Sequence, residues 1–223
     1  QVLNTLFAAM VKSEVRHRHH MPVVFHSRAQ LKIGLVGGSF NPAHDGHIHV
    51  AIEARQQLGL DQIWWLVSPQ NPLKSTVGMV SHEKRLANAR EIAIPYPFLR
   101  VIAPESRLPN NYTYNTLKYL LKTMPRARLI WVMGADNLEH FHRWYRYRDL
   151  IHLLPIAVID RPGYSLKAIA KGRWLLGRRS QVTKMRYAIA TRSLNLPTWC
   201  FIAGRLNGAS ATEIRQRKEN GLY

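Results

Sequence analysis

The chain has 223 residues, 46 % of them hydrophobic, which is enough for one well-buried domain. No apolar run approaches the roughly 18–20 residues that a membrane-spanning helix needs, so the sequence excludes such a helix. Lys and Arg outnumber Asp and Glu by 32 to 13, and the net charge of +19 must attract polyanions, either nucleic acid or phosphorylated substrates.

Residues 1–30 differ from the rest of the chain, with four Lys or Arg, one acid and the run His17-Arg18-His19-His20. We expect a flexible basic extension ahead of one domain over residues 31–223. An Arg-rich, acid-poor leader is also typical of organellar transit peptides, but the chain begins with Gln, which favours a natural start at Met10 or Met21. No ligand partner follows the histidines at a recognisable spacing, which favours a solvated tail over a metal site.

From residue 31 onward, strand-sized apolar runs alternate with helical patterns. The predicted strands are Leu31–Gly37, Gln62–Val67, Leu99–Ile102, Leu129–Met133, Pro155–Ile159 and Thr198–Ile202. The predicted helices are Gly46–Leu58 closed by Gly59, a helix capped by Ser81 that runs to about Ile92, Thr113–Lys122, and a last one from the capping box Ser210-x-x-Glu213. This alternation predicts an α/β fold with a doubly wound parallel sheet, whose ligands bind beyond the carboxyl ends of the strands.

One segment interrupts the alternation. From Arg161 to Arg192 the chain has nine Lys or Arg residues and no acid, which predicts a basic helical insertion over residues 161–192. Its part from Lys167 onward contains none of the motifs described below, so we expect an accessory surface feature that attracts heparin or nucleic acid. The alternative is a lid in which Arg178 and Arg179 fold over a bound nucleotide.

The single cysteine, Cys200, cannot form an internal disulfide, which fits the reducing cytoplasm. Its neighbours in the sequence are Trp199 and Phe201. We therefore expect a small buried thiol there rather than a catalytic one.

The strongest chemical signal is the loop after the first predicted strand, Gly37-Gly38-Ser39-Phe40-Asn41-Pro42-Ala43-His44-Asp45-Gly46-His47. Its two leading glycines let the backbone approach a ligand, and the free N–H groups of the following helix favour an anion. His44 and His47 are one helical turn apart, so both imidazoles can point at one phosphate. Gly46 leaves room for a base or sugar.

This loop resembles the signature of the nucleotidyltransferase superfamily, in the long form of bacterial nicotinate-mononucleotide adenylyltransferases. Three further segments match that family in order: Trp131–Leu138 followed by Phe141 and Trp144-Tyr145, then Asp160-Arg161-Pro162-Gly163-Tyr164, then Ser210-Ala211-Thr212-Glu213-Ile214-Arg215. The resemblance implies a Rossmann-like fold and adenylyl transfer from ATP to nicotinate mononucleotide, which yields nicotinate adenine dinucleotide and pyrophosphate in NAD biosynthesis. The family commonly has Asp where this chain has Asn41.

The resemblance also implies three sets of site residues. The catalytic residues are expected to be His44, His47 and Arg215. The ATP-binding residues are expected to be Gly38, Ser39, Phe40, Gly46, Gly134, Asp136, Ser210 and Thr212. The acceptor-binding residues are expected to be Asn41, Lys74, Tyr112, Thr113, Trp144, Tyr145 and Arg161. No carboxylate cluster indicates a metal cage, so Mg²⁺ is expected to be bound through the nucleotide phosphates.

Alternatives stay open at several points. Trp144 fits the core as well as a stack on a pyridine ring, and Asp136 fits a structural turn. Another adenylyltransferase, with nicotinamide mononucleotide or phosphopantetheine as acceptor, would share the first loop and the Ser-x-Thr motif. A phosphopantetheine enzyme would leave Trp144-Tyr145 and Arg161-Pro162-Gly163 unexplained. A nucleic-acid-binding protein would show a salt-steep affinity without ATP turnover. No membrane partner is expected, and a homo-oligomer is left open.

Overall fold

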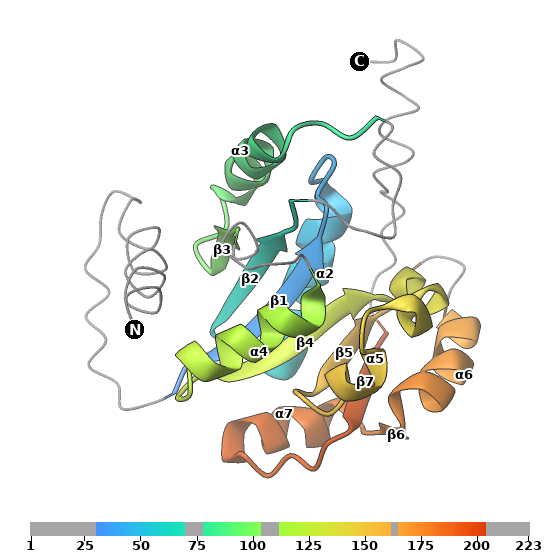
Figure 1. Cartoon of the computed structure of the whole chain (residues 1–223). Coiled ribbons are helices and arrows are strands. Elements are labelled where there is room, and N and C mark those ends of the chain that lie inside the picture. The colour runs from blue at the N-terminus through green and yellow to red at the C-terminus, as the bar shows by residue number, and fades with distance from the viewer. Residues whose placement is uncertain (1–29, 70–77, 104–111, 162–164, 204–223) are drawn as a thin grey trace.

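The structure, a computed structural model, describes residues 30–69, 78–103, 112–161 and 165–203 (Figure 1). Its strands form one sheet in the order β3-β2-β1-β4-β5-β7-β6, and every pairing is parallel. The strands are β1 Lys32–Gly38, β2 Gln62–Val67, β3 Leu99–Ile102, β4 Arg128–Gly134, β5 Ile156–Ile159, β6 Arg178–Arg179 and β7 Thr198–Ile202.

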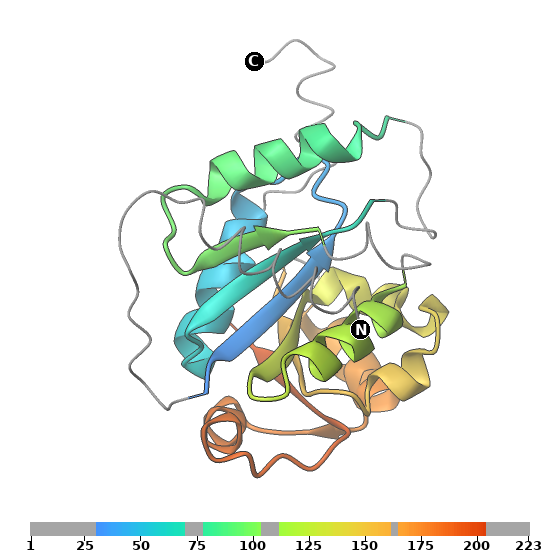
Figure 2. The ribbon, with the colours of Figure 1, turned by 60° about the vertical axis from the view of Figure 1, so that its left-hand side comes forward.

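Helices cover both faces of this sheet, so the predicted doubly wound α/β fold is confirmed. One face carries α2 Asp45–Leu58, α3 His82–Ala93 and α7 Val182–Thr191. The other carries α4 Thr113–Thr123, the 3₁₀ helices η2 Ala135–Glu139 and η3 Phe141–Arg143, α5 Tyr147–Leu150 and α6 Ser165–Leu176. The two views show α2 and α4 on opposite sides of the sheet (Figures 1 and 2).

Alternate residues of each strand enter different cores. In β2, Trp64 and Leu66 join the core under α4, whereas Ile63, Trp65 and Val67 join the core under α2. Side chains of a strand alternate between its faces, so a strand buried on both faces must be apolar throughout. This is why the strands could be predicted as continuous apolar runs, with the bounds of β2, β3 and β7 correct to the residue.

The predicted helix ends also have a physical cause in the structure. Gly59 ends α2 in the left-handed conformation, with φ 63°, and its N–H donates to the carbonyl of Arg55. Glycine enters this conformation without the strain that a Cβ causes. Ser81 begins α3, and its hydroxyl accepts a hydrogen bond from the N–H of Lys84 at 3.4 Å.

The basic segment is the crossover between β5 and β7 rather than an accessory insertion. Its helix α6 buries Leu175 and Leu176 in one core, and its helix α7 buries Met185 and Ile189 in the other. The expectation of a surface feature followed the charges, and the helix residues Lys167, Arg173, Lys184 and Arg186 are exposed. Since both cores include residues of this segment, its excision should expose them.

The sheet order has its switch point at the centre, between β1 and β4. The chain runs outward from β1 to β3, then returns to the other side of β1 with β4. The connections after β1 and β4 therefore leave toward opposite faces, and ligands of doubly wound folds bind where such connections diverge. Among the described helices, none combines the length and apolar character needed to cross a bilayer.

Candidate active site

His44 and His47 meet at the start of α2 through reciprocal capping. The His44 Nδ1 accepts a hydrogen bond from the N–H of Gly46 at 3.0 Å, and the His47 Nδ1 accepts one from the N–H of His44 at 3.3 Å. The two ring centroids lie 4.0 Å apart. The sequence predicted that the two imidazoles lie on one side, and the structure brings them together there.

These hydrogen bonds also determine where each neutral imidazole carries its proton. A ring nitrogen that accepts a hydrogen bond has no proton, so in each neutral ring the proton is on Nε2. His44 and His47 can therefore each offer an Nε2–H donor while the Nδ1 atoms hold the rings against the backbone. Two such donors beside a helix N-terminus suit a phosphate.

Two aromatic rings support His47 from the core. The ring of Phe40 lies 4.7 Å from that of His47 and stacks at 4.9 Å on the ring of Trp65. Phe40 and Trp65 are both fully buried. Phe40 was expected to bind ATP, but its buried side chain packs against the histidine, so only its backbone could face a nucleotide. Trp65 was not among the expected site residues, because one apolar residue in a buried strand looks like any other.

A close approach of β1 to β4 shapes the other side of the loop. A Cβ at Gly37 would lie 2.4 Å from Cη2 of Trp131, which is closer than real Cβ contacts come. Glycine is therefore required here by the large ring of the neighbouring strand. The next residue, Gly38, accepts a hydrogen bond from the N–H of Ser68 at 2.9 Å, which joins the loop to the end of β2.

Side chains of the loop and of α3 also tie this region together. The Asn41 amide donates to the carbonyl of Gly78 at 3.1 Å and accepts from the N–H of Val80 at 3.2 Å. Asn88 of α3 accepts from the N–H of Ala43 at 3.0 Å. Asn41 was expected to bind the acceptor; that role stays a prediction, and in the structure its amide orders the turn before α3.

The structure adds Arg85, which sequence reasoning missed. Its guanidinium is buried and donates to main-chain carbonyls at the carboxyl edge of the sheet. A signal was present, because Arg85, Ala89 and Ala93 share the spacing of one helix face, and all three are buried. An arginine on a face otherwise lined by alanines marks a buried charge.

After β4, the structure brings together residues expected to serve different substrates. Arg161 Nε lies 3.7 Å from Oδ1 of Asp136, whose side chain is 43 % exposed. A Cβ at Gly134 would lie 2.4 Å from that same Oδ1, so glycine leaves the space that the carboxylate occupies. The expected ATP-binding residue Asp136 thus adjoins the expected acceptor-binding residue Arg161.

The aromatic residues expected around the acceptor each stack or pack against another ring. Tyr112, which precedes α4, stacks on Tyr145 at 4.4 Å, and Trp144 packs edge-on against Trp131 at 6.0 Å. Trp144 is half-buried and packs against the core, and its expected stack on a pyridine ring stays a prediction. Thr113 is the first residue of α4, and the side chain of Tyr112 does not cap this helix.

Four expected site residues, Lys74, Ser210, Thr212 and Arg215, lie outside the described residues. Within the described ranges, no three His, Cys, Asp or Glu side chains gather as metal ligands would. The expected roles of these four residues stay predictions.

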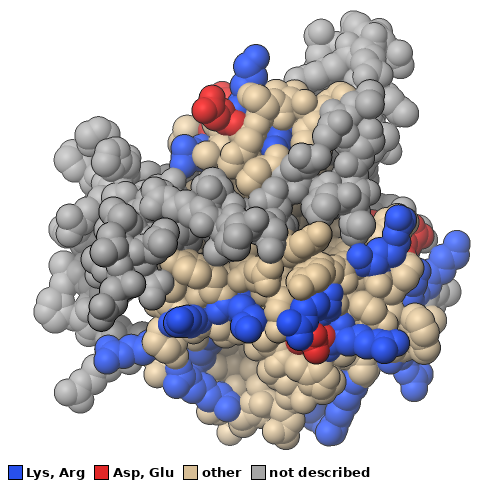
Figure 3. Space-filling model, viewed as in Figure 1, with Lys and Arg blue, Asp and Glu red and all other residues tan. Residues whose placement is uncertain are grey.

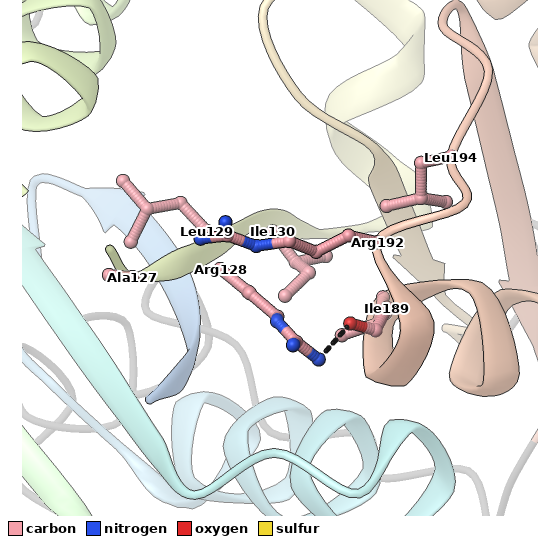
Figure 4. A pocket seen from close by; sticks show the side chains of 7 residues that line it. All are labelled: Ala127, Arg128, Leu129, Ile130, Ile189, Arg192 and Leu194. Atoms are coloured by element: carbon pink, nitrogen blue, oxygen red, sulfur yellow. Dashed lines mark hydrogen bonds between the residues drawn. The ribbon is translucent and has the colours of Figure 1, made fainter. Parts of the chain in front are cut away.

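Two hollows elsewhere on the described surface contain none of the expected site residues. One, of about 200 Å³, lies at the amino end of β4, where Arg128 donates to the carbonyl of Ile189 at 2.8 Å and so caps the end of α7 (Figure 4). The other, of about 790 Å³, lies by β6 among Arg173, Arg178 and Arg179. On the face shown in Figure 3, Lys and Arg side chains far outnumber acidic ones.

Known proteins resemble this chain in sequence and fold. Residues 35–217 match the family described as cytidylyltransferase-like. A protein from Parvibaculum lavamentivorans is 46 % identical over 188 residues, which are 84 % of this chain and 92 % of that protein. One from Erythrobacter litoralis is 46 % identical over 190 residues, covering 84 % and 85 %. Both are named "probable nicotinate-nucleotide adenylyltransferase".

A solved structure shares the fold. The nicotinic acid mononucleotide adenylyltransferase of Plasmodium falciparum, complexed with NaAD, matches with a TM-score of 0.62 at 18 % identity, over 84 % of this chain and 83 % of that chain. The paired imidazoles beside the switch point between β1 and β4 and the relatives at 46 % identity point to the same family. The chain belongs to the cytidylyltransferase-like family and, within it, to the nicotinate-nucleotide adenylyltransferases.

Proposed function

We propose that this protein transfers the adenylyl group of ATP to nicotinate mononucleotide, giving nicotinate adenine dinucleotide and pyrophosphate. The observation that carries the proposal is the pair of imidazoles at the start of α2, each turned by its capping bond so that Nε2–H is its donor. The names of the relatives and the NaAD in the P. falciparum enzyme support the choice of substrates.

The reaction needs positioning and charge stabilisation rather than a protein nucleophile. A phosphate oxygen of the mononucleotide forms a bond to the α-phosphorus of ATP. The bond from that phosphorus to the bridging oxygen breaks, and pyrophosphate leaves with the electron pair. The Nε2–H groups of His44 and His47 stabilise the charge on the α-phosphate, which is the kind of preorganised donor that lowers such barriers.

The remaining phosphates need their own contacts. We assign the leaving pyrophosphate to Arg215, Ser210 and Thr212, where the sequence predicts a helix start, because a helix N-terminus and a planar guanidinium both bind phosphate oxygens. Mg²⁺, when bound, would neutralise part of the triphosphate charge. Because no ligand cluster occurs among the described residues, they fit an ion held through the phosphates better than a protein cage.

For the acceptor, we assign the pyridine ring to the half-buried face of Trp144 and its carboxylate to the start of α4 at Thr113. The side chain of Tyr112 does not cap that helix, and the N-terminus of a helix favours an anion. An amide in place of the carboxylate has no negative charge, and it replaces one of the two acceptor oxygens by an NH2 donor that faces other donors.

Incubation with ATP and each acceptor, scored by pyrophosphate release, tests the proposal. Nicotinate mononucleotide is expected to give the highest kcat/KM, with nicotinamide mononucleotide lower and phosphopantetheine inactive. Turnover of phosphopantetheine alone, or of no acceptor, would overturn the proposal. A cytoplasmic location and a homo-oligomer stay predictions, to be checked by cell fractionation and by light scattering on the purified protein.

A further inference from the structure

We propose that Arg85 is a positioning residue that holds the loop between β1 and α2 in register with the main chain on either side of residues 70–77. The inference rests on the function proposed above, because it assigns the ATP phosphates to the first segment and the acceptor phosphate to the neighbourhood of the second. Arg85 does not itself touch substrate in this proposal. It acts through the main chain on both sides of the reaction centre.

The contacts of Arg85 are all with main-chain carbonyls. Its Nη1 donates to Ser39 at 2.5 Å and to Ser68 at 2.8 Å. Its Nη2 donates to Pro69 at 2.5 Å, and its Nε donates to Val80 at 2.9 Å. A guanidinium has five N–H donors in a rigid plane, and four carbonyls from distant parts of the chain take up most of them.

These carbonyls lie in or beside the segments that are expected to contact the two substrates. Ser39 belongs to the loop between β1 and α2, which presents the paired imidazoles. Pro69 and Val80 stand on either side of residues 70–77, the segment that contains Lys74, the residue expected near the acceptor phosphate. One side chain therefore joins this donor loop to described main chain on both sides of the segment that contains Lys74.

Burying the charged guanidinium of Arg85 costs free energy, so packing alone does not explain why an arginine occupies this position. The side chain is 2 % exposed, and no carboxylate pairs with it among the described residues. Burial lowers the pKa of the Arg85 guanidinium, although arginine stays charged in proteins. Apolar residues often replace buried charges without loss of stability, and the other buried residues of this helix face, Ala89 and Ala93, are alanines.

The expected consequence follows from the geometry of the reaction. In-line transfer requires the acceptor oxygen and the α-phosphorus to be aligned, and a misplacement of about 1 Å can cost roughly 10²-fold in rate. Without Arg85, four carbonyls lose their common donor, and the donor loop loses its tie to the main chain that flanks residues 70–77. Both substrates should therefore be affected together, even though neither contacts the changed side chain.

The test compares Arg85→Lys and Arg85→Met with two control variants. Asn88→Ala removes a contact to Ala43 of the donor loop alone. Ile189→Ala removes a buried side chain of α7 at the amino edge of β4, opposite the site, and lowers stability without touching either loop. For each purified protein, the melting temperature, kcat and the KM for each substrate are measured.

We expect Arg85→Met to lower kcat by about 10²-fold and to raise both KM values. Arg85→Lys should recover part of the loss, because an ammonium still reaches some of the carbonyls. Asn88→Ala should raise the KM for ATP without raising that for the mononucleotide, and Ile189→Ala should lower the melting temperature with kinetic constants within about twofold of wild type. If Arg85→Met fails to fold, Arg85→Lys decides in the same way.

A different outcome for the Arg85 variants would overturn the proposed positioning role. If the Arg85 variants lose stability but keep kcat and both KM values within about threefold, the arginine only supports the fold and the positioning role is overturned. Absence of turnover in the wild-type protein would instead overturn the proposed function, and the inference with it. The two failures are therefore distinguishable in one set of measurements.

Discussion

His44 has two roles that a pair of substitutions can separate. Its Nδ1 caps α2 by accepting from the N–H of Gly46, and its Nε2–H is the donor expected to face the α-phosphate. In asparagine, Oδ1 occupies about the position of the imidazole Nδ1, and asparagine is a favoured N-cap. His44→Asn should therefore keep the cap and remove the donor, whereas His44→Ala removes both.

The size of each effect can be worked out from the structure. Loss of a cap costs about 1 kcal/mol, and a buried N–H left without a partner adds a cost of about the same size. The side chain of His44 is 6 % exposed, so the unpaired N–H would be poorly reached by water. Roughly 2 kcal/mol lowers the melting temperature of a domain of this size by about 4–8 °C. Removal of the phosphate-stabilising donor should lower kcat by about 10²–10³-fold in both variants.

The assay is a thermal melt of each variant together with steady-state pyrophosphate release at saturating ATP and nicotinate mononucleotide. His44→Asn is expected to melt near wild type and His44→Ala several degrees lower, with kcat equally low in both. The reasoning is refuted if His44→Asn turns over within a few-fold of wild type, because the donor role would then be wrong. Equal melting temperatures for both variants would refute the capping role.

Four further predictions follow from the same structure. His47→Ala should lower kcat by ~10²-fold while ATP affinity falls much less, as isothermal titration would show. Nicotinate mononucleotide should exceed the amide in kcat/KM, and equal values would contradict the assignment of its carboxylate to a helix start. Burial raises the pKa of Cys200 to about 12, above the usual ~8.5. The buried neutral thiol therefore contributes to the stability of the fold below pH ~8.5, and this contribution is lost as the pH rises toward 12. At pH 8 the thiol of the native protein should resist DTNB and react only at the rate of unfolding. Charge removal at the exposed residues Arg173, Arg178 and Arg179 should weaken heparin retention and its salt dependence without changing kcat.

Local pattern was sufficient for most of the fold. The strands could be predicted because burial on both faces requires unbroken apolar runs, and helix ends because Gly59 and Ser81 satisfy terminal backbone groups by themselves. The pairing of His44 with His47 was also predictable, since one helical turn separates them. Each of these features depends on residues a few positions apart, and such distances are visible in a sequence.

Other features depend on which distant segments meet. Nine cations without an acid suggested an accessory segment, yet the buried sides of α6 and α7 make it part of both cores. Charge composition does not reveal which face of a helix is covered. The helix pattern could mark Arg85 as buried, but its contacts were hidden, because Ser39 lies 46 positions away and its carbonyl carries no sequence signal. Only the tertiary structure determines these contacts. Main-chain carbonyls are the same in every residue, so the sequence does not indicate which of them the folded chain places beside the guanidinium of Arg85.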